Sequence, residues 1–260
     1  MTILARSDAA SIATLTLQAP ERLNALSDAM LEALTDALDK IAADPGIRVV
    51  VLKGAGKAFC AGHDLKEMQA GRQAADGGAA YFKDLFDRCA AMMARIQSMP
   101  QPVIAQVHGI ATAAGCQLVA TCDLAIAADD TRFGVNGVNI GLFCSTPMVA
   151  LTRNIGRKKA FEMLTTGQFL SASQAQEAGL INSAVSAADL DASVQDLAQS
   201  IAAKLPVAVK IGKQAFYAQA QMPTAEAYAY TGQVMVDNML ERDTDEGINA
   251  FLEKRKPDWS

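Results

Sequence analysis

Two segments of the chain combine small and polar residues in an order suited to holding developing negative charge. The first, residues 57–67, reads KAFCAGHDLKE and follows a buried apolar run. The second reads PVIAQVHG at residues 102–109 and continues as ATAAGCQL at residues 111–118. Glycines and alanines let a backbone approach a ligand and aim N–H groups at it. A helix start adds unpaired N–H groups and a positive dipole end.

Each segment alone also has an ordinary structural interpretation. Residues 57–67 fit a strand-to-helix turn capped by Asp64, and glycine-rich helix starts are common. The second segment has no following GK[ST], and the chain has no GxGxxG, so neither a P-loop nor a dinucleotide fingerprint is present. Together, however, two backbone donors from separate loops can converge on one oxygen, which is how an oxyanion hole is built.

These segments need a scaffold of strands and helices to position them. Apolar periodicity predicts strands at residues 12–17, 49–52, 103–107, 124–128 and 181–185. A first helix is capped by Ser27 and broken at Asp44-Pro45-Gly46. Further helices are predicted at residues 81–99, 113–121, 146–155, 158–165, 171–178, 189–204, 207–219, 224–241 and 244–255. Three glycines stand where C-terminal helix caps are expected, at Gly156, Gly167 and Gly179.

The order of these elements predicts an α/β fold, because a strand, a helix and a further strand suggest a crossover unit. We expect an α/β core over residues 1–200. A helical region over residues 201–260 is expected to pack on this core or on a neighbouring subunit.

Composition restricts the classes of function. Of 260 residues, 51% are hydrophobic and 20% are charged, which is enough apolar material for a packed core. The net charge of -5 argues against nucleic acid or an anionic membrane surface as a partner. No apolar run approaches the roughly 20 residues that a bilayer crossing needs.

The cysteines and histidines indicate that the protein belongs in a reducing compartment. They also argue against a metal centre in it. Five cysteines contain no CxxC pair, which fits buried, reduced thiols better than a disulfide framework or a zinc site. The chain has two histidines, His63 and His108, so histidine-based metal sites are poorly supplied. The N-terminal residues show no signal-peptide pattern. We therefore expect a cytoplasmic protein with no bound metal and no permanently bound cofactor.

Several blocks, in order, resemble the enoyl-CoA hydratase/isomerase (crotonase) superfamily. They are AFCAGHDLKEM, PVIAQVHGIATAAGCQLVATCDLAIA, RFGVNGVNIGL, GRKKAFEML, TGQFLSASQAQEAGLIN and AFLEKRKPDW. The resemblance runs from about residue 12 to residue 259 and is specific for the superfamily but not for one reaction. The motifs GHDLKE, TAAGCQL and GLFCSTP are similar to those of the family's enoyl-CoA hydratase domain-containing protein 3 branch.

The resemblance implies a crotonase-like fold of repeated ββα turns with a C-terminal helical region, assembled as trimers or dimers of trimers. It implies a coenzyme A thioester as substrate or ligand, and a place in fatty acid metabolism. The thioester carbonyl would lie between the backbone N–H groups of His63 and Ala114. Such fixed donors stabilise an enolate or a similar oxyanion.

The resemblance also assigns residues to coenzyme A binding. The matching positions are Leu23, Asn24, Ala25, Lys57, Ala61, Asp64, Leu65 and Lys66, and Phe251 and Lys254 match positions that reach a neighbouring subunit's ligand. Lys57 and Lys66 would supply local positive charge near phosphates. The alternative for each lysine is an ordinary solvated surface residue.

The chain departs from the hydratases at both of their catalytic glutamates. The first aligns with Gln117, whose amide is neither an acid nor a base near neutral pH. The second aligns with Gly137, which has no side chain. Other polar groups follow Phe133, at Asn136, Asn139, Cys144 and Ser145; Ser145 lies near the position where a dehalogenase branch carries a nucleophilic aspartate, but no base is evident for it.

Three functions remain open from the sequence. One is an acyl-CoA lyase, isomerase or thioester hydrolase that uses the oxyanion hole with other polar groups. The second is a non-catalytic acyl-CoA-binding or regulatory member of the family. The third, an RNA-binding member, is disfavoured by the acidic charge.

Overall fold

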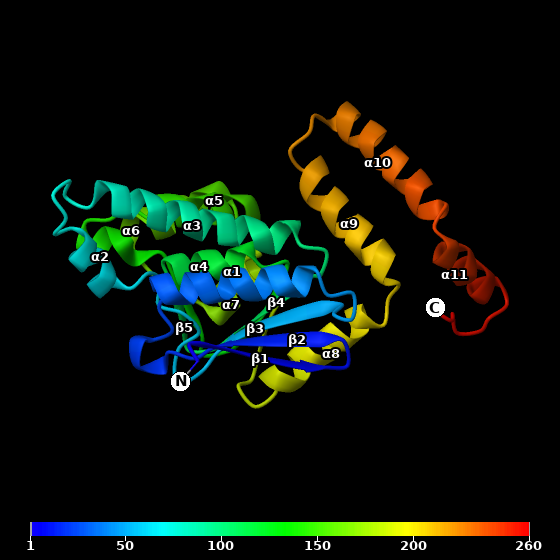
Figure 1. The fold of residues 1–260 in the computed structure, drawn as a ribbon, viewed down its shortest axis with the longest axis horizontal. Helices are drawn as coiled ribbons and strands as arrows, with labels where there is room; N and C mark the ends of the chain where they lie inside the picture. Colours follow the sequence, from blue (N-terminus) through cyan, green and yellow to red (C-terminus); the bar gives the residue numbers. More distant parts are fainter. Residues whose placement is uncertain (1, 260) are drawn as a thin grey trace.

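The computed structural model describes residues 2–259, and a six-stranded sheet forms its centre (Figure 1). The strand order is β1-β2-β3-β4-β6-β9, with bounds Leu4–Ala9, Ile12–Leu17, Val49–Gly54, Val103–Val107, Leu124–Ala128 and Ser183–Val185. Neighbouring strands are parallel except β1 and β2. Strand β1 was not predicted, because it is a largely exposed edge strand with little apolar alternation.

A smaller sheet runs beside the first and contains β5 (Ile110–Thr112), β7 (Arg132–Gly134) and β8 (Leu170–Ser171). Strands β4 and β5 lead into helix α4 (Ala114–Thr121), and β6 and β7 lead into the 3-10 helix η2 (Asn136–Ile140) and helix α5 (Ser145–Asn154). Each such unit places its first strand in the large sheet and its second strand in the small one. The sequence did not predict the strands of the small sheet, because two or three residues give too little periodic signal; β9, also of three residues, lies within the longer apolar run predicted at residues 181–185.

Helices cover both faces of the large sheet, which explains the continuous apolar run of β3. Val50 and Leu52 belong to the core that includes residues of α1 (Asp28–Ala42) and α3 (Ala79–Ser98). Val49 and Val51 belong to a second core, with residues of α8 (Leu190–Ala202). A strand buried on both sides needs apolar residues at every position.

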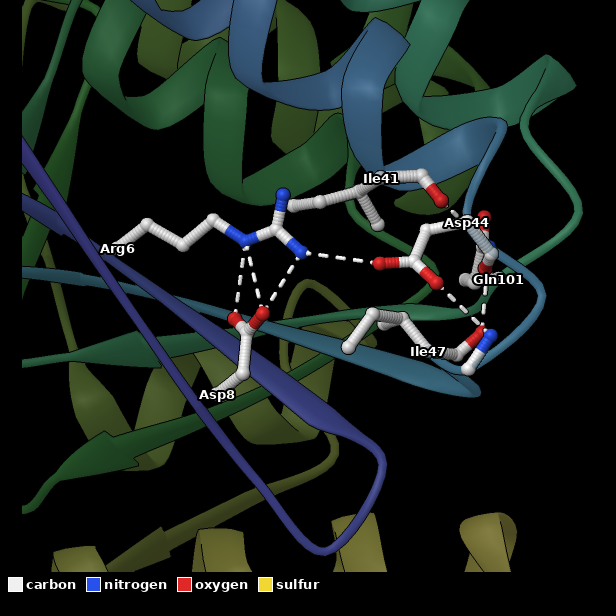
Figure 2. Close-up of polar contacts among 7 residues, drawn as sticks. Arg6, Asp8, Ile41, Asp44, Ile47 and Gln101 are labelled. Carbon is white, nitrogen blue, oxygen red and sulfur yellow. Dashed lines mark hydrogen bonds and ion pairs between the residues drawn. The ribbon is translucent and has the colours of Figure 1, made fainter.

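The turn after α1 confirms the predicted break at Asp44. Figure 2 shows Arg6 between the carboxylates of Asp8 and Asp44, at 2.8 Å and 3.5 Å. The amide Nε2 of Gln101 donates to the carbonyls of Ile41 (2.8 Å) and Ile47 (3.2 Å) in the same view. These contacts close the turn, and so they set where β3 enters the sheet.

Local capping signals largely match the elements that they were expected to end. The hydroxyl of Ser27 accepts from the N–H of Met30 at the start of α1. Gly167 (φ 64°) and Gly179 (φ 82°) end their helices in the left-handed conformation. The prediction for Gly156 was wrong: this glycine precedes a helix, because the backbone turns to extended geometry at residue 155 and α5 has already ended.

The remaining helices complete the predicted α/β fold of ββα units and a C-terminal helical region. They are α2 (Leu65–Gly71), α6 (Arg157–Thr166), α7 (Ala172–Ala178), α9 (Pro206–Gln219), α10 (Thr224–Met239) and α11 (Arg242–Leu252), with a 3-10 turn, η1, at Pro20–Arg22. Helices α10 and α11 extend away from the core (Figure 1). The boundary at residue 200 stays a prediction.

Candidate functional site

The turn that contains Leu23 and Asn24 holds the first donor segment, residues 58–63. The fully buried amide of Asn24 donates to the carbonyl of Ala58 at 2.7 Å. The N–H of Ala61 donates to the carbonyl of Leu23 at 3.0 Å. The segment is therefore tied to the body of the protein by both backbone and side-chain hydrogen bonds.

The second donor segment is the start of α4, where the backbone is strained. Ala113, immediately before the helix, has φ 51° and ψ -121°, a region that a residue with a Cβ rarely adopts. Its N–H donates to the carbonyl of Gly134 at 2.9 Å, which holds it there. Strain of this kind costs about 1–3 kcal/mol and persists where the surroundings enforce it. The following residue, Ala114, is the first of the helix, where an N–H has no partner within the helix.

The two segments touch each other. A Cβ built on Gly62, which has φ 91°, would lie 3.2 Å from the nitrogen of Ala114, and one built on Gly115 would lie 2.1 Å from the carbonyl oxygen of Cys60. Among the described residues, no backbone carbonyl outside a regular helix or strand accepts from the N–H of His63 or of Ala114. The two donor segments therefore meet next to Ala114, and backbone donors from two segments can converge on one oxygen.

These donors border a cavity of about 420 Å³. Its wall contains the predicted site residues Ala61, His63, Leu65, Ala114, Gly137 and Ser145. The rest of the wall is mainly apolar and comes from α2, α3, the junction of β5 with α4 and the segment after β7: Met68, Phe86, Thr112, Ala113, Asn136, Ile140, Leu142, Phe143, Cys144, Thr146 and Pro147. No Lys, Arg, Asp or Glu is among these described wall residues.

The two positions of the missing glutamates differ in their surroundings. Gln117, on α4, is 5% exposed, is not a wall residue, and its Oε1 is buried without a hydrogen-bond partner. Gly137 lies in the wall, but a Cβ there would lie 2.5 Å from the carbonyl oxygen of Leu142 and 2.8 Å from the sulfur of Cys144. A glutamate at residue 137 therefore requires a different backbone.

The imidazole of His63 is the titratable nitrogen group in the wall. Its Nδ1 lies 3.3 Å from the carbonyl oxygen of Leu26, and its ring packs edge-on against Phe86 with centroids 5.7 Å apart. Burial lowers the pKa of His63, although the Leu26 carbonyl opposes this shift. Its Nε2 is buried and has no partner.

The hydroxyl and thiol groups of the wall show no sign of activation. Ser145 begins α5, and its hydroxyl donates to the carbonyl of Phe143 at 3.3 Å. No described base contacts this hydroxyl. Burial raises the pKa of the Cys144 thiol, which disfavours the reactive thiolate.

The sequence analysis did not single out Thr112, whose hydroxyl donates to Oδ1 of Asn136 at 2.6 Å. Both residues are in the cavity wall. Asn136 had been noted among the polar residues after Phe133, whereas Asn139 of the same group is exposed and outside the wall. The position of Thr112 two residues before Ala114 was the one available signal.

The other positions predicted for coenzyme A lie outside the cavity wall. They are Leu23, Ala25, Lys57, Asp64, Lys66, Phe251 and Lys254. Asp64 is buried and caps α2 by accepting from the N–H of Lys66 at 2.8 Å, and Arg22 pairs with its carboxylate at 3.1 Å. The Asp64 cap is thus confirmed, and the side chains of Lys57 and Lys66 are exposed.

The comparisons with known proteins agree over nearly the whole chain. The family model described as "Enoyl-CoA hydratase/isomerase" matches residues 7–260. Human enoyl-CoA hydratase domain-containing protein 3, mitochondrial, is 44% identical over 249 residues, which are 96% of this chain and 80% of that protein.

Solved structures match equally well. The crystal structure of an enoyl-CoA hydratase from Mycobacterium smegmatis has a TM-score of 0.96 and 52% identity, covering 100% of this chain and 99% of that chain. The crystal structure of human enoyl Coenzyme A hydratase domain-containing protein 3 has a TM-score of 0.94 and 42% identity, covering 99% of this chain and 100% of that chain.

The expectation of a cytoplasmic protein is contradicted by the relatives. The matched domain-containing proteins 3 of frog, human and rat are named mitochondrial. Free, buried cysteines such as the five found here separate reducing from oxidising compartments. They do not separate one reducing compartment from another, which is why composition pointed to the cytoplasm.

Among the described helices, none is long and apolar enough to cross a bilayer.

Proposed function

Because this chain belongs to the enoyl-CoA hydratase/isomerase (crotonase) family, in its enoyl-CoA hydratase domain-containing protein 3 branch, we propose that it binds a coenzyme A thioester and stabilises the thioester enolate. The observation that supports this proposal is the contact between the two segments that carry the N–H groups of His63 and Ala114, both of which are residues of the cavity wall. Donors aimed at the oxygen of an enolate stabilise it more than they stabilise the ground-state carbonyl.

Hydration of an enoyl thioester is not the reaction that we propose. Hydration needs groups that deliver and remove protons, and each such group contributes a factor of about 10²–10⁴ in rate. Gln117 and Gly137 supply none, and the backbone at Gly137 leaves no room for a side chain. This proposal covers isomerase, lyase and thioester-hydrolase reactions that proceed through an enolate or a related oxyanion.

The coenzyme A part of the ligand is proposed to lie outside the cavity, along the turn at Leu23 and Ala25 and the start of α2. Exposed Lys57 and Lys66 would pair with its phosphates, and Asp64 would hold the start of α2 in place. Phe251 and Lys254, at the exposed end of the chain, would approach the ligand of a neighbouring copy in a homotrimer or a dimer of trimers.

The second candidate is a non-catalytic acyl-CoA-binding protein. It is favoured by the absence of a carboxylate or lysine among the described wall residues. Both candidates predict binding, so turnover distinguishes them. Membership of an RNA-binding side branch is disfavoured by the net charge of -5.

The test is exchange of the α-hydrogens of butyryl-CoA in D₂O, followed by NMR, beside isothermal titration calorimetry. We expect binding and faster exchange than in buffer, with solvent or buffer base taking the α-proton because the described wall holds no carboxylate, and we expect hydration of crotonyl-CoA near background. Gly62→Ala is expected to lower exchange at least about tenfold, because its Cβ would lie 2.9 Å from that of Ala113 and would push the two donor segments apart.

Gly77→Ala is the matched control, because Gly77 also has a positive φ (68°) but its Cβ would meet no atom within 4 Å. Binding without exchange would support the non-catalytic candidate. Rapid hydration of crotonyl-CoA by the wild type would contradict the argument from Gln117 and Gly137.

A further inference from the structure

Two polar side chains in the cavity wall are joined across the small sheet. Strand β5 pairs with β7 in parallel, with Thr112 opposite Gly134. The hydroxyl of Thr112, a residue only 9% exposed, donates to Oδ1 of Asn136 at 2.6 Å. A hydroxyl held this close fixes the orientation of the amide plane, since the amide oxygen faces Thr112.

This hydrogen bond leaves the other end of the Asn136 amide available. Its Nδ2 carries two N–H groups, and no described residue accepts from them. This nitrogen is also not among the described polar atoms that are buried and unpaired. Because Asn136 lines the cavity, the free N–H groups are presented to a ligand there.

The position of Asn136 relates it to the thioester carbonyl. Ala114 and Asn136 each lie two residues beyond the paired residues Thr112 and Gly134, at the same end of two neighbouring parallel strands. The oxyanion donor of Ala114 and the amide of Asn136 are therefore neighbours. An acyl group held by its carbonyl at Ala114 would bring its first few carbons past Asn136.

The charge of the wall restricts what Asn136 can recognise. The described wall contains no Lys or Arg to pair with a carboxylate, and much of it is apolar, as at Phe86, Ile140 and Leu142. Moving a carboxylate from water into such a site without a counter-charge is costly, whereas a neutral oxygen needs only one donor.

We propose that Asn136, held by Thr112, is a specificity-determining residue that selects coenzyme A thioesters whose acyl chain carries a neutral hydrogen-bond acceptor near the thioester. The inference rests on the proposed function, because it takes the thioester carbonyl to be bound at Ala114. A hydroxyl or carbonyl oxygen on the acyl chain accepts from the free N–H of Asn136, whereas an unsubstituted alkyl chain has no acceptor to offer.

Calorimetric dissociation constants for butyryl-CoA and for the two enantiomers of 3-hydroxybutyryl-CoA test this. These three thioesters differ only in the presence of one hydroxyl and in its direction. In the wild type, one enantiomer should bind about three- to tenfold more tightly than butyryl-CoA, as one net hydrogen bond allows. The other enantiomer should gain little, and succinyl-CoA should bind more weakly than either.

In Asn136→Ala the ratio of the dissociation constants for the two enantiomers should fall to about one. Asn136→Asp keeps the shape and the acceptor for Thr112 but has no N–H groups, so it should lose the preference between the enantiomers as well. Thr112→Val keeps the shape of residue 112 and should reduce the ratio by freeing the amide. Asn139→Ala is the matched control: Asn139 is exposed on the same 3-10 helix, outside the wall, and should keep the wild-type ratio.

Equal binding of butyryl-CoA and both enantiomers by the wild type overturns this inference and leaves the proposed function standing. A preference that survives in both Asn136 variants does the same. Tighter binding of succinyl-CoA overturns the charge argument on which the inference depends. Failure to bind any of the thioesters overturns the proposed function itself.

Discussion

The imidazole of His63 is held in one tautomer by the carbonyl of Leu26. A carbonyl oxygen only accepts, so the proton is on Nδ1 at 3.3 Å, and Nε2 carries a lone pair that is buried without a partner. Burial disfavours the charged imidazolium and lowers the pKa of His63. The side chain at this position therefore stays neutral.

This neutral state predicts a pH dependence of stability. An unfolded histidine titrates near about pH 6.5, and the folded pKa is lower. Between the two values the unfolded chain binds more protons, so the stabilisation present above about pH 6.5 is lost as the pH falls through this window. Urea denaturation at about pH 7.5 and pH 5.5 should show a smaller loss for His63→Asn than for the wild type. An unchanged pH slope would show that folding does not lower the pKa of His63.

At the scale of elements, one buried ion pair fastens α9 to the core. The ammonium of Lys213 donates to Asp123 at 2.7 Å and to the carbonyls of Ile96 (2.7 Å) and Gln101 (2.8 Å). Tyr217, one turn later, donates to the other oxygen of Asp123 at 2.8 Å. Burial lowers the pKa of Lys213, and Asp123 opposes that shift. All three ammonium protons are used, so the helix is docked in one position.

Removing one partner of this pair should be costly. Lys213→Met leaves the Asp123 carboxylate without its cation, and a broken buried pair costs about 3–5 kcal/mol of unfolding free energy. Lys210→Met is the matched control, because Lys210 is exposed on the same helix, and it should change stability by less than about 0.5 kcal/mol. Urea denaturation measures both. A loss below about 1 kcal/mol in Lys213→Met would mean that the pair does not anchor α9.

At the scale of the whole molecule, the C-terminal helices expose an apolar surface. Large apolar side chains on and near α10 and α11 are 51–82% exposed, at Tyr228, Met235, Val236, Met239, Leu240, Phe251 and Leu252. Four of them, Met235, Met239, Phe251 and Leu252, border one groove. Exposed apolar side chains gathered in this way mark an interface. This surface supports the proposal of a homotrimer or a dimer of trimers, in which a second copy covers these helices.

Charge placed on this surface should break the assembly. Met235→Glu/Leu240→Glu is expected to shift the wild-type oligomer to monomers in sedimentation velocity, since each glutamate would be desolvated without a partner. Gln233→Glu is the matched control on the polar side of α10, where the residue contacts Asp237, and it should leave the oligomer intact. A monomeric wild type would contradict the proposed assembly.

The family, the order of most elements and the absence of both hydratase glutamates were evident from the sequence alone. These depend on motifs and on residues a few positions apart, such as the cap of Ser27 and the apolar alternation of the strands. The sequence also pointed to the two loops that carry the N–H groups of His63 and Ala114, because those loops follow neighbouring parallel strands.

What the side chains around those donors contact depends on the tertiary structure. The contact of Thr112 with Asn136 joins residues 24 positions apart, and that of Lys213 with Asp123 joins residues 90 apart. The lack of space at Gly137 and the tautomer of His63 likewise depend on carbonyls that other turns supply. Such contacts follow from strand register and helix packing, which place distant residues side by side and leave no periodic trace in the sequence.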